Sequence, residues 1–360
     1  MFSLRSRNFA FVFIFLCWLF IANSATAHAQ VIAYVTNFCD GTVSRLDTST
    51  NDVIGFFDIG GTPDTPALSP DGSRLYVTNL DQHQVWVFDT ATNALVTKIS
   101  VGDFPSGVAF TPDGKSAYVA NESGMISVID TSTNTVTTTI PENLGPRQLA
   151  ITSDGKLVYV ANGAGSVSNT VSVINTANNT IVATIPVGVA PSGLAITPDG
   201  SRVYVTNQNG NSVSVIDRGT NTVIATIPVD VGPRGIAITS DGTRAYVATN
   251  VSIDVIDTGA NVVVTTIPFL VNSNFMAFTP DGTRLYVTSL DARVFIIDVA
   301  TNLIVASGRD GVCPVNIVIG DISPKPKTKD DCKDNGFTRF TSPVFRNQGQ
   351  CVKYVNEHTH

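Results

Sequence analysis

Short runs of β-branched and apolar residues alternate with polar turn clusters from Val31 onward, and the repeats lack the 3.6-residue apolar period of a helix. One unit contains four such runs, Ser192–Thr197, Arg202–Thr206, Ser212–Ile216 and Thr222–Pro228, which predict four short strands. Clusters of Asp, Asn, Gly and Thr separate the runs. The pattern therefore predicts an all-β fold built from four-stranded units.

The unit repeats along the chain. The phrase Tyr-Val-Thr/Ala-Asn, or a close relative, begins at seven positions: Tyr34, Tyr76, Tyr118, Tyr159, Tyr204, Tyr246 and Tyr286. The spacings between them are 42, 42, 41, 45, 42 and 40 residues. A period of about 40 residues with four strands per repeat is typical of a β-propeller blade. Residues 31–321 are therefore predicted to form a seven-bladed β-propeller.

Two turn signals recur in these repeats. Asp-Gly pairs, in which glycine supplies the positive φ of a tight hairpin, begin at Asp71, Asp113, Asp154, Asp199, Asp241 and Asp281. A cluster of the type Asp-Thr-x-Thr-Asn begins at Asp47, Asp89, Asp130, Asn175, Asp217, Asp257 and Asp298. Asx side chains in such clusters bond their own backbone, so most aspartates of the chain are predicted to be structural.

The two ends of the repeat region are predicted to complete one blade together. The first repeat opens with a second strand, Ile32 to Asn37, and the last ends with an unpartnered first strand, Val315 to Gly320. Pairing these strands closes the ring, an arrangement known as velcro closure, and leaves no open radial edge.

Cysteine positions support this closure. Cys39 follows the N-terminal strand and Cys313 precedes the C-terminal one, so an antiparallel pair brings them together and predicts a Cys39–Cys313 disulfide. The chain-entropy model gives such a long loop about 4 to 5 kcal/mol of stabilisation. Two free thiols are the alternative.

The first 29 residues are predicted to be a signal peptide. Arg5 and Arg7 precede an apolar run, Phe9 to Ala22, which is shorter than the ~20 residues of a membrane span. Small residues then favour cleavage after Ala27 or Ala29, and a retained membrane anchor is the alternative. Cleavage lowers the net charge from −7 to −9. The mature protein is therefore predicted to be secreted, periplasmic or extracellular, with no membrane span and no nucleic-acid partner.

A Pro- and Lys-rich linker, residues 322–331, separates the repeats from a small C-terminal module, residues 332–360. The module is too short to build a core without a staple, so a Cys332–Cys351 bridge is predicted. It resembles a short C-terminal motif of many secreted bacterial proteins, a likeness of about 25 residues that implies no established chemistry.

The seven Tyr-Val-Thr-Asn phrases, with Val-Ser-Val-Ile-Asp and Pro-Asp-Gly at fixed offsets, resemble the YVTN family of β-propeller repeat proteins. The resemblance covers about Val31 to Asp321. It implies the fold but no single activity, because the family and its structural relatives include surface-layer and envelope proteins as well as lactonase-like enzymes. Tyr246 and Tyr286 begin phrases without the motif asparagine, so this asparagine is predicted to be structural.

Few residues suit catalysis. His83 is the sole histidine of the repeats, which argues against a histidine metal cluster and makes a Ser-His-Asp site depend on His83 alone. No Cys-x-x-Cys-His motif occurs, and neither a metal nor a cofactor is predicted. Asp, Asn and Glu oxygens at the channel mouth, Glu122 among them, could assemble a calcium-dependent lactonase site. The alternative for Glu122 is a solvated loop carboxylate.

The loops that lead into the innermost strands differ between blades and line the predicted channel mouth. Two of them carry arginine, Pro146-Arg147-Gln148 and Pro233-Arg234-Gly235, so Arg147 and Arg234 are predicted to face one funnel. Guanidinium groups suit carboxylate or phosphate, which indicates an anionic small molecule or an acidic peptide as ligand. The alternative is that each arginine pairs with a neighbouring carboxylate or carbonyl.

These features favour a monomeric binding or scaffold protein of the cell envelope or exterior, with an unidentified ligand or protein as its partner. A lactonase-like hydrolase using Asp, Asn or Glu at the mouth is the alternative function.

Overall fold

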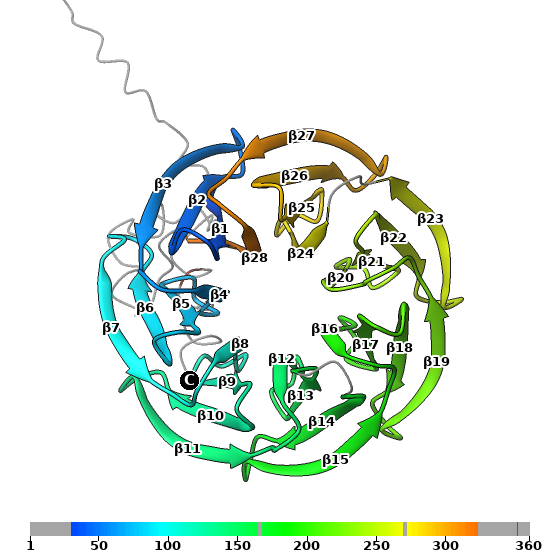
Figure 1. Ribbon diagram of the computed structural model, residues 1–360, viewed down its shortest axis with the longest axis horizontal. Coiled ribbons are helices and arrows are strands. Elements are labelled where there is room, and N and C mark those ends of the chain that lie inside the picture. Colours follow the sequence, from blue (N-terminus) through cyan, green and yellow to red (C-terminus); the bar gives the residue numbers. More distant parts are fainter. Residues whose placement is uncertain (1–29, 165–167, 269–271, 323–350, 352–360) are drawn as a thin grey trace, which may run out of the picture.

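The computed structural model describes residues 30–164, 168–268, 272–322 and 351 of the 360-residue chain. In these residues, 28 strands form seven four-stranded antiparallel sheets. Figure 1 shows the sheets arranged as blades around a central axis. The predicted seven-bladed β-propeller is therefore confirmed.

Each blade runs from an innermost to an outermost strand. The innermost strands are β4 (Pro63–Leu68), β8 (Pro105–Phe110), β12 (Pro146–Ile151), β16 (Pro191–Ile196), β20 (Ile236–Ile238), β24 (Ser273–Phe278) and β28 (Pro314–Asp321). The second strands are β1 (Val31–Asn37), β5 (Arg74–Asn79), β9 (Ser116–Asn121), β13 (Leu157–Asn162), β17 (Arg202–Asn207), β21 (Arg244–Ala248) and β25 (Arg284–Ser289). The third strands are β2 (Thr42–Asp47), β6 (Gln84–Asp89), β10 (Met125–Asp130), β14 (Thr170–Asn175), β18 (Ser212–Asp217), β22 (Ser252–Asp257) and β26 (Arg293–Asp298). The outermost strands are β3 (Asp52–Asp58), β7 (Leu95–Ser100), β11 (Thr135–Pro141), β15 (Thr180–Pro186), β19 (Thr222–Pro228), β23 (Val262–Pro268) and β27 (Leu303–Arg309).

Blades are numbered here from the one that contains β1, so β4 to β7 form blade 2 and β24 to β27 form blade 7. Because neighbouring strands are antiparallel, the loops that enter the innermost strands and those that join second to third strands lie at one end of every blade. This end is called the entrance face. The remaining loops, which carry the Asp-Gly and Asp-x-x-x-Asn turns, form the opposite face.

The core lies between neighbouring blades. The second strands are buried on both sides, as their Tyr, Val and Ala residues pack against the blade before and the blade after. One such cluster joins Tyr204, Val213 and Ile227 of blade 5 to Ala245 and Ile256 of blade 6. Burial on both sides explains why these strands have continuous apolar sequences rather than alternating apolar and polar residues.

The motif tyrosine also links adjacent blades through its hydroxyl group. Tyr204 Oη donates a hydrogen bond to Asn261 Oδ1 at 2.8 Å in the next blade. Asn261 has a positive φ of 55°, a conformation that asparagine tolerates better than most residues. Equivalent pairs occur at Tyr76, Tyr118, Tyr159, Tyr246 and Tyr286. Tyr34 is the exception, because its hydroxyl has no hydrogen-bond partner in the described part of the chain.

The motif asparagine holds the loop between the second and third strands of its own blade. Asn207 Nδ2 donates to Ser212 Oγ at 3.1 Å and to Ser214 Oγ at 2.9 Å. Asn37 and Asn162 bond the equivalent hydroxyl groups of their blades. The predicted structural role of this residue is thus confirmed.

The ring closes as predicted. β28 pairs antiparallel with β1 in a sheet of order β28-β1-β2-β3, with Ile32 opposite Gly320 (Figure 1). The disulfide predicted between Cys39 and Cys313 is present, with a Cα–Cα distance of 5.5 Å. Blade 1 is therefore closed by a strand pair and a covalent bond.

The predicted signal peptide, most of the linker and the C-terminal module lie outside the described residues. The predicted Cys332–Cys351 bridge does as well, because Cys332 is not among them. Within the described ranges, the structure contains no helix with the length and apolar character that a membrane crossing requires.

Candidate functional site at the entrance face

The motif threonine positions the first residues of the innermost strands. In blade 2, Thr78 Oγ1 accepts a hydrogen bond from Thr65 N at 2.9 Å and donates one to Ser106 O of blade 3 at 2.7 Å. In blade 5, Thr206 Oγ1 accepts from Gly193 N at 2.7 Å and donates to Arg234 O of blade 6 at 2.6 Å. The threonine thus fixes the backbone of one particular residue in the next blade.

That residue follows the proline at the start of each innermost strand, and its identity changes around the ring. In blade order from blade 2, it is Asp64, Ser106, Arg147, Ser192, Arg234, Asn274 and Val315. In blade 7, Ser273 pairs with Ser289 as Pro63 pairs with Asn79, so Ser273 takes the place of proline. A constant backbone therefore presents a variable set of side chains.

Two carboxylates, a hydroxyl and a guanidinium gather on blades 2 to 4, and we call these residues the axial cluster: Asp64, Ser106, Glu122 and Arg147. Ser106 Oγ donates to Asp64 Oδ2 at 2.8 Å. Arg147 Nε lies 3.9 Å from Glu122 Oε1, an ion pair too long for a hydrogen bond. Glu122 lies in a loop beside Arg147 and is half-buried, with 30% of its side chain exposed.

Both carboxylates of the axial cluster hold protons more tightly than usual. Burial raises the pKa of Asp64 to about 6, against the opposing effects of the Ser106 hydroxyl and the Arg147 charge. Burial likewise raises the pKa of Glu122, again opposed by Arg147 and Ser106. The nearby Glu122 charge adds to the shift of Asp64. The axial cluster therefore gains positive charge as the pH falls toward 6.

Arg234 is a half-buried cation with a neutral partner. Its Nη1 donates to Asn274 Oδ1 at 2.9 Å, and its Nε is buried without a hydrogen-bond partner in the described part of the chain. Among those residues, no carboxylate lies within ion-pair distance of it. Burial lowers the pKa of Arg234, and the positive charge of Arg147 lowers it further. The two arginines are thus near enough to repel each other.

A second layer of amides and hydroxyls connects distant blades beneath these charges. Gln148 Nε2 of blade 4 donates to Thr65 Oγ1 of blade 2 at 2.9 Å, across the side-chain-free Gly107 of blade 3. Asn316 Nδ2 of blade 1 donates to the same Thr65 oxygen at 3.1 Å. These residues are buried, so the network forms a rigid base for the axial cluster.

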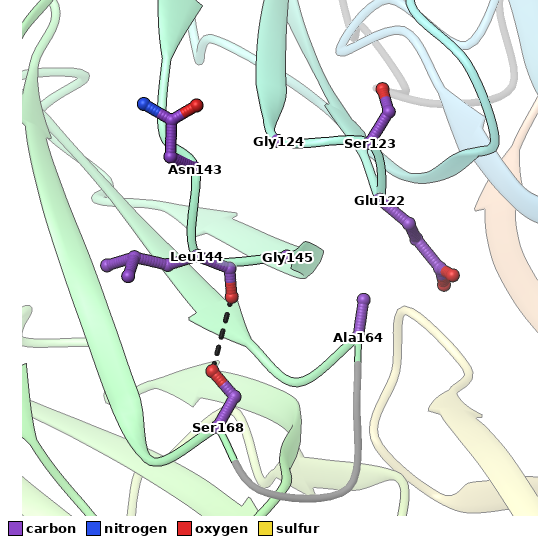
Figure 2. Close-up of a pocket in the computed structure, with 8 residues that line it drawn as sticks. All are labelled: Glu122, Ser123, Gly124, Asn143, Leu144, Gly145, Ala164 and Ser168. Carbon is purple, nitrogen blue, oxygen red and sulfur yellow. Dashed lines mark hydrogen bonds between the residues drawn. The ribbon is translucent and has the colours of Figure 1, made fainter.

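A pocket of about 460 Å³ adjoins the axial cluster between blades 3 and 4. Its lining consists of Glu122, Ser123, Gly124, Asn143, Leu144, Gly145, Ala164 and Ser168. Figure 2 shows the Glu122 side chain turned away from those of Asn143 and Leu144, and Ser168 Oγ donating to Leu144 O at 3.2 Å. Glu122 therefore lines this pocket and also lies beside Arg147.

Two further carboxylates of the entrance face are buried where other loops are apolar. Glu142 and Asp310 lie four residues before the start of β12 and β28, at the position that Ile59, Val101 and Val187 occupy in other blades. Burial raises the pKa of Glu142, and that of Asp310 to about 6. Glu142 Oε2 and both carboxylate oxygens of Asp310 have no hydrogen-bond partner in the described part of the chain.

The remaining sequence candidates do not join the axial cluster. His83 Nδ1 accepts a hydrogen bond from Phe104 N at 3.2 Å, and its ring packs edge-on against that of Phe104. Its Nδ1 lies 3.8 Å from Asp103 Oδ1. Across the described residues, no three His, Cys, Asp or Glu side chains gather in a metal-binding group.

Comparisons with known proteins agree with this architecture. Residues 65–227 match the family model described as "Lactonase, 7-bladed beta-propeller". The chain is a seven-bladed β-propeller. The match covers less than half of it, and no curated protein matches the chain.

Several solved structures share the fold. Hydrazine synthase of Kuenenia stuttgartiensis is 25% identical with a TM-score of 0.66, over 71% of this chain and 88% of that one. A functionally unknown protein from Desulfotomaculum acetoxidans is 20% identical with a TM-score of 0.71, over 80% of this chain and 98% of that one. The dihydro-heme d1 dehydrogenase NirN, solved in complex with DHE, is 16% identical with a TM-score of 0.61, over 81% and 75%. These likenesses establish the fold.

Sequence reasoning found both arginines of the entrance but missed the part played by Asp64 and Ser106. The signal was available, because both residues occupy the position of Arg147 and Arg234 in their own blades. The sequence had placed Glu122 among the channel-mouth carboxylates, but it did not reveal that Glu122 lies beside Arg147 and Asp64.

Proposed function

We propose that this protein is a binding protein whose entrance face accepts an anionic group between Arg147 and Arg234. The observation that carries the proposal is the uncompensated, half-buried charge of Arg234. Removing a charge from water is costly unless an opposite charge replaces the lost hydration. A carboxylate or phosphate bound at Arg234 would supply that charge.

The geometry of the guanidinium supports an anion as the ligand. Arg234 Nη1 donates to Asn274 and its Nε is buried, so the donors that remain for an oxygen ligand are on its terminal nitrogens. Arg147 is in a loose ion pair with Glu122, so its donors also remain accessible. Planar guanidinium groups bind carboxylate and phosphate through two parallel hydrogen bonds, which gives specificity as well as affinity. A small dicarboxylate, a phosphate or an acidic peptide fits this description.

We place this activity outside the cytoplasm. The Cys39–Cys313 disulfide is typical of proteins that fold in oxidising compartments. The signal-like first 29 residues support the same location. A partner or ligand of the envelope or exterior follows from that location.

The test is isothermal titration calorimetry of the secreted protein with glutarate, inorganic phosphate and a tri-aspartate peptide. We expect at least one to bind, and Arg234→Gln to weaken it tenfold or more because the counter-charge is lost. Arg244→Gln is the matched control, since Arg244 lies in the same blade at the opposite face. Equal affinity of wild type and Arg234→Gln for every anion that binds, or no binding of any, would contradict the proposal.

Lactone hydrolysis is the second candidate function. The family-model match over residues 65–227 and the axial cluster of Asp64, Glu122 and Arg147 favour it. A carboxylate could accept the proton of an attacking water while a guanidinium stabilises the oxyanion that forms on the carbonyl oxygen. Turnover of δ-valerolactone that Asp64→Asn abolishes would support this function, and a wild-type protein without turnover would refute it.

A further inference from the structure

The entrance face carries a ring of exposed apolar side chains. Eight residues make up this apolar rim: Phe38, Phe104, Leu144, Val189, Val231, Val251, Leu290 and Val312. Each lies in a loop of the entrance face and is 38% to 51% exposed. In the described residues, the loops of the opposite face contain no large hydrophobic side chain of comparable exposure. This asymmetry between the two faces indicates that the entrance face is the one suited to binding an apolar partner surface.

The apolar rim surrounds the arginines. Five of its members, Phe104, Leu144, Val189, Val231 and Val312, lie one or two residues before the proline that opens, or in blade 6 precedes, an innermost strand. Arg147 and Arg234 directly follow two of those prolines. Cationic groups near the axis are thus encircled by apolar loop tips from six of the seven blades.

The backbone of the apolar rim is held in place. The carbonyl of Val189 accepts a hydrogen bond from Asn209 N at 3.2 Å, and that of Val231 from Asn250 N at 2.9 Å. Val312 O accepts from Cys39 N at 3.2 Å, beside the disulfide. Each of these loops is thereby fixed to the loop of the next blade. A surface ordered before binding loses less conformational entropy when a partner docks.

We propose that the apolar rim and Arg234 form one docking surface for an extended peptide segment of a partner protein, with an acidic side chain flanked by apolar ones. This inference rests on the proposed function and specifies its ligand. The acidic side chain supplies the counter-charge that Arg234 lacks, and its apolar neighbours cover the rim. A small anion would satisfy the arginines but leave the rim exposed on every side. Arginine is enriched at interface hot spots, and aromatic residues such as Phe38 and Phe104 are enriched in interfaces as a whole.

The experiment selects random 12-residue peptides displayed on phage against the full-length secreted protein, with counter-selection against Arg234→Gln. We expect the enriched clones to share an acidic residue between apolar ones. The best peptide is then labelled with fluorescein, and its affinity is measured by fluorescence anisotropy. Failure to enrich any such clone would overturn the inference.

Two matched double variants separate the apolar rim from general surface hydrophobicity. Val189→Ser with Val231→Ser removes two rim residues, and Val96→Ser with Val182→Ser removes two equally exposed valines of the outermost strands. We expect the rim variant to bind the peptide at least tenfold more weakly and the outer-strand variant to bind it like wild type. Equal peptide affinity of rim variant and wild type would overturn the inference.

Glutarate distinguishes the failure of this inference from the failure of the proposed function. If glutarate binds through Arg234 and the rim variant keeps its affinity for peptide, the proposed function stands and the peptide surface does not. If neither glutarate nor peptide depends on Arg234, both proposals fail.

Discussion

Carboxyl groups on the two faces of the ring have pKa values shifted in opposite directions. On the opposite face, hydrogen bonds from Thr197 and from the Ser201 backbone lower the pKa of Asp199 to about 2, and the repeated turn aspartates follow the same pattern. On the entrance face, burial raises the pKa of Asp64 and of Asp310 to about 6. The first set of carboxylates stabilises turns. In the second set, folding disfavours the ionised form of the carboxyl group. Such raised pKa values are typical of residues at binding and catalytic sites.

The same difference appears in side-chain variety. The opposite face repeats its Asp-Gly and Asp-x-x-x-Asn turns from blade to blade, because each turn needs the same backbone conformation. The entrance face changes its residue at one fixed backbone position from Asp64 to Arg147 to Val315. Repetition thus marks the structural end of each blade, and variation marks the end where a ligand can be selected.

The largest expected effect concerns the closure of the ring at the entrance face. Replacing Cys39 and Cys313 by serine should lower the free energy of unfolding by about 4 to 5 kcal/mol, because the unfolded chain regains the entropy of a very long loop. Urea unfolding followed by circular dichroism measures this. A reducing agent should destabilise the propeller of the wild type far more than that of the double variant, which keeps only the predicted Cys332–Cys351 bridge. Equal urea midpoints for the two proteins would show that the β1–β28 strand pair alone holds the ring.

A smaller effect is expected from the contacts that the opposite face makes between blades. Tyr204→Phe leaves Asn261 Oδ1 without its donor and should cost about 1 to 2 kcal/mol. Tyr34→Phe is the matched control, since the Tyr34 hydroxyl lacks this hydrogen bond to the next blade in the described residues and its loss should cost less. Thermal unfolding compares them. A Tyr34→Phe variant destabilised as much as Tyr204→Phe would contradict a role for the hydrogen bond.

The smallest effect concerns the pH dependence of stability, which should differ between carboxyl groups of the two faces. A carboxyl group whose pKa is raised by folding binds more protons in the native state between its unfolded pKa near 4 and its folded pKa near 6. Its contribution to stability therefore falls as the pH rises through that window. Asp310→Val, which introduces the type of side chain found in other loops, should stabilise the protein by about 1 kcal/mol at pH 7.5 and by less at pH 4.5.

Asp199→Asn should behave in the reverse sense. The pKa of Asp199 is lowered in the native state, so its stabilising effect is present above pH 4 and is lost as the pH falls through about 2. The variant should be less stable than wild type at pH 7.5, by a small amount because Asp199 is exposed to solvent. Parallel pH profiles for Asp310→Val and Asp199→Asn would refute the contrast between the faces.

The sequence by itself determined the blade count, the turns and the ring closure. These depend on local chemistry that repeats at a fixed period, such as the glycine of each Asp-Gly turn, and on the position of Cys39 and Cys313 relative to two strands. The YVTN resemblance, the signal peptide and the C-terminal bridge remain predictions from the sequence. So does the role of Arg147 and Arg234 in binding.

Tertiary structure alone decided which residues meet at the ring axis. Asp64 and Arg147 come from two innermost strands and Glu122 from the loop after β9, and their proximity follows from the arrangement of neighbouring blades. It also decided that Arg234 faces an amide rather than a carboxylate. Charge compensation and burial are sums over neighbours in space, and a repeat pattern along the chain carries no information on those neighbours until the ring is closed.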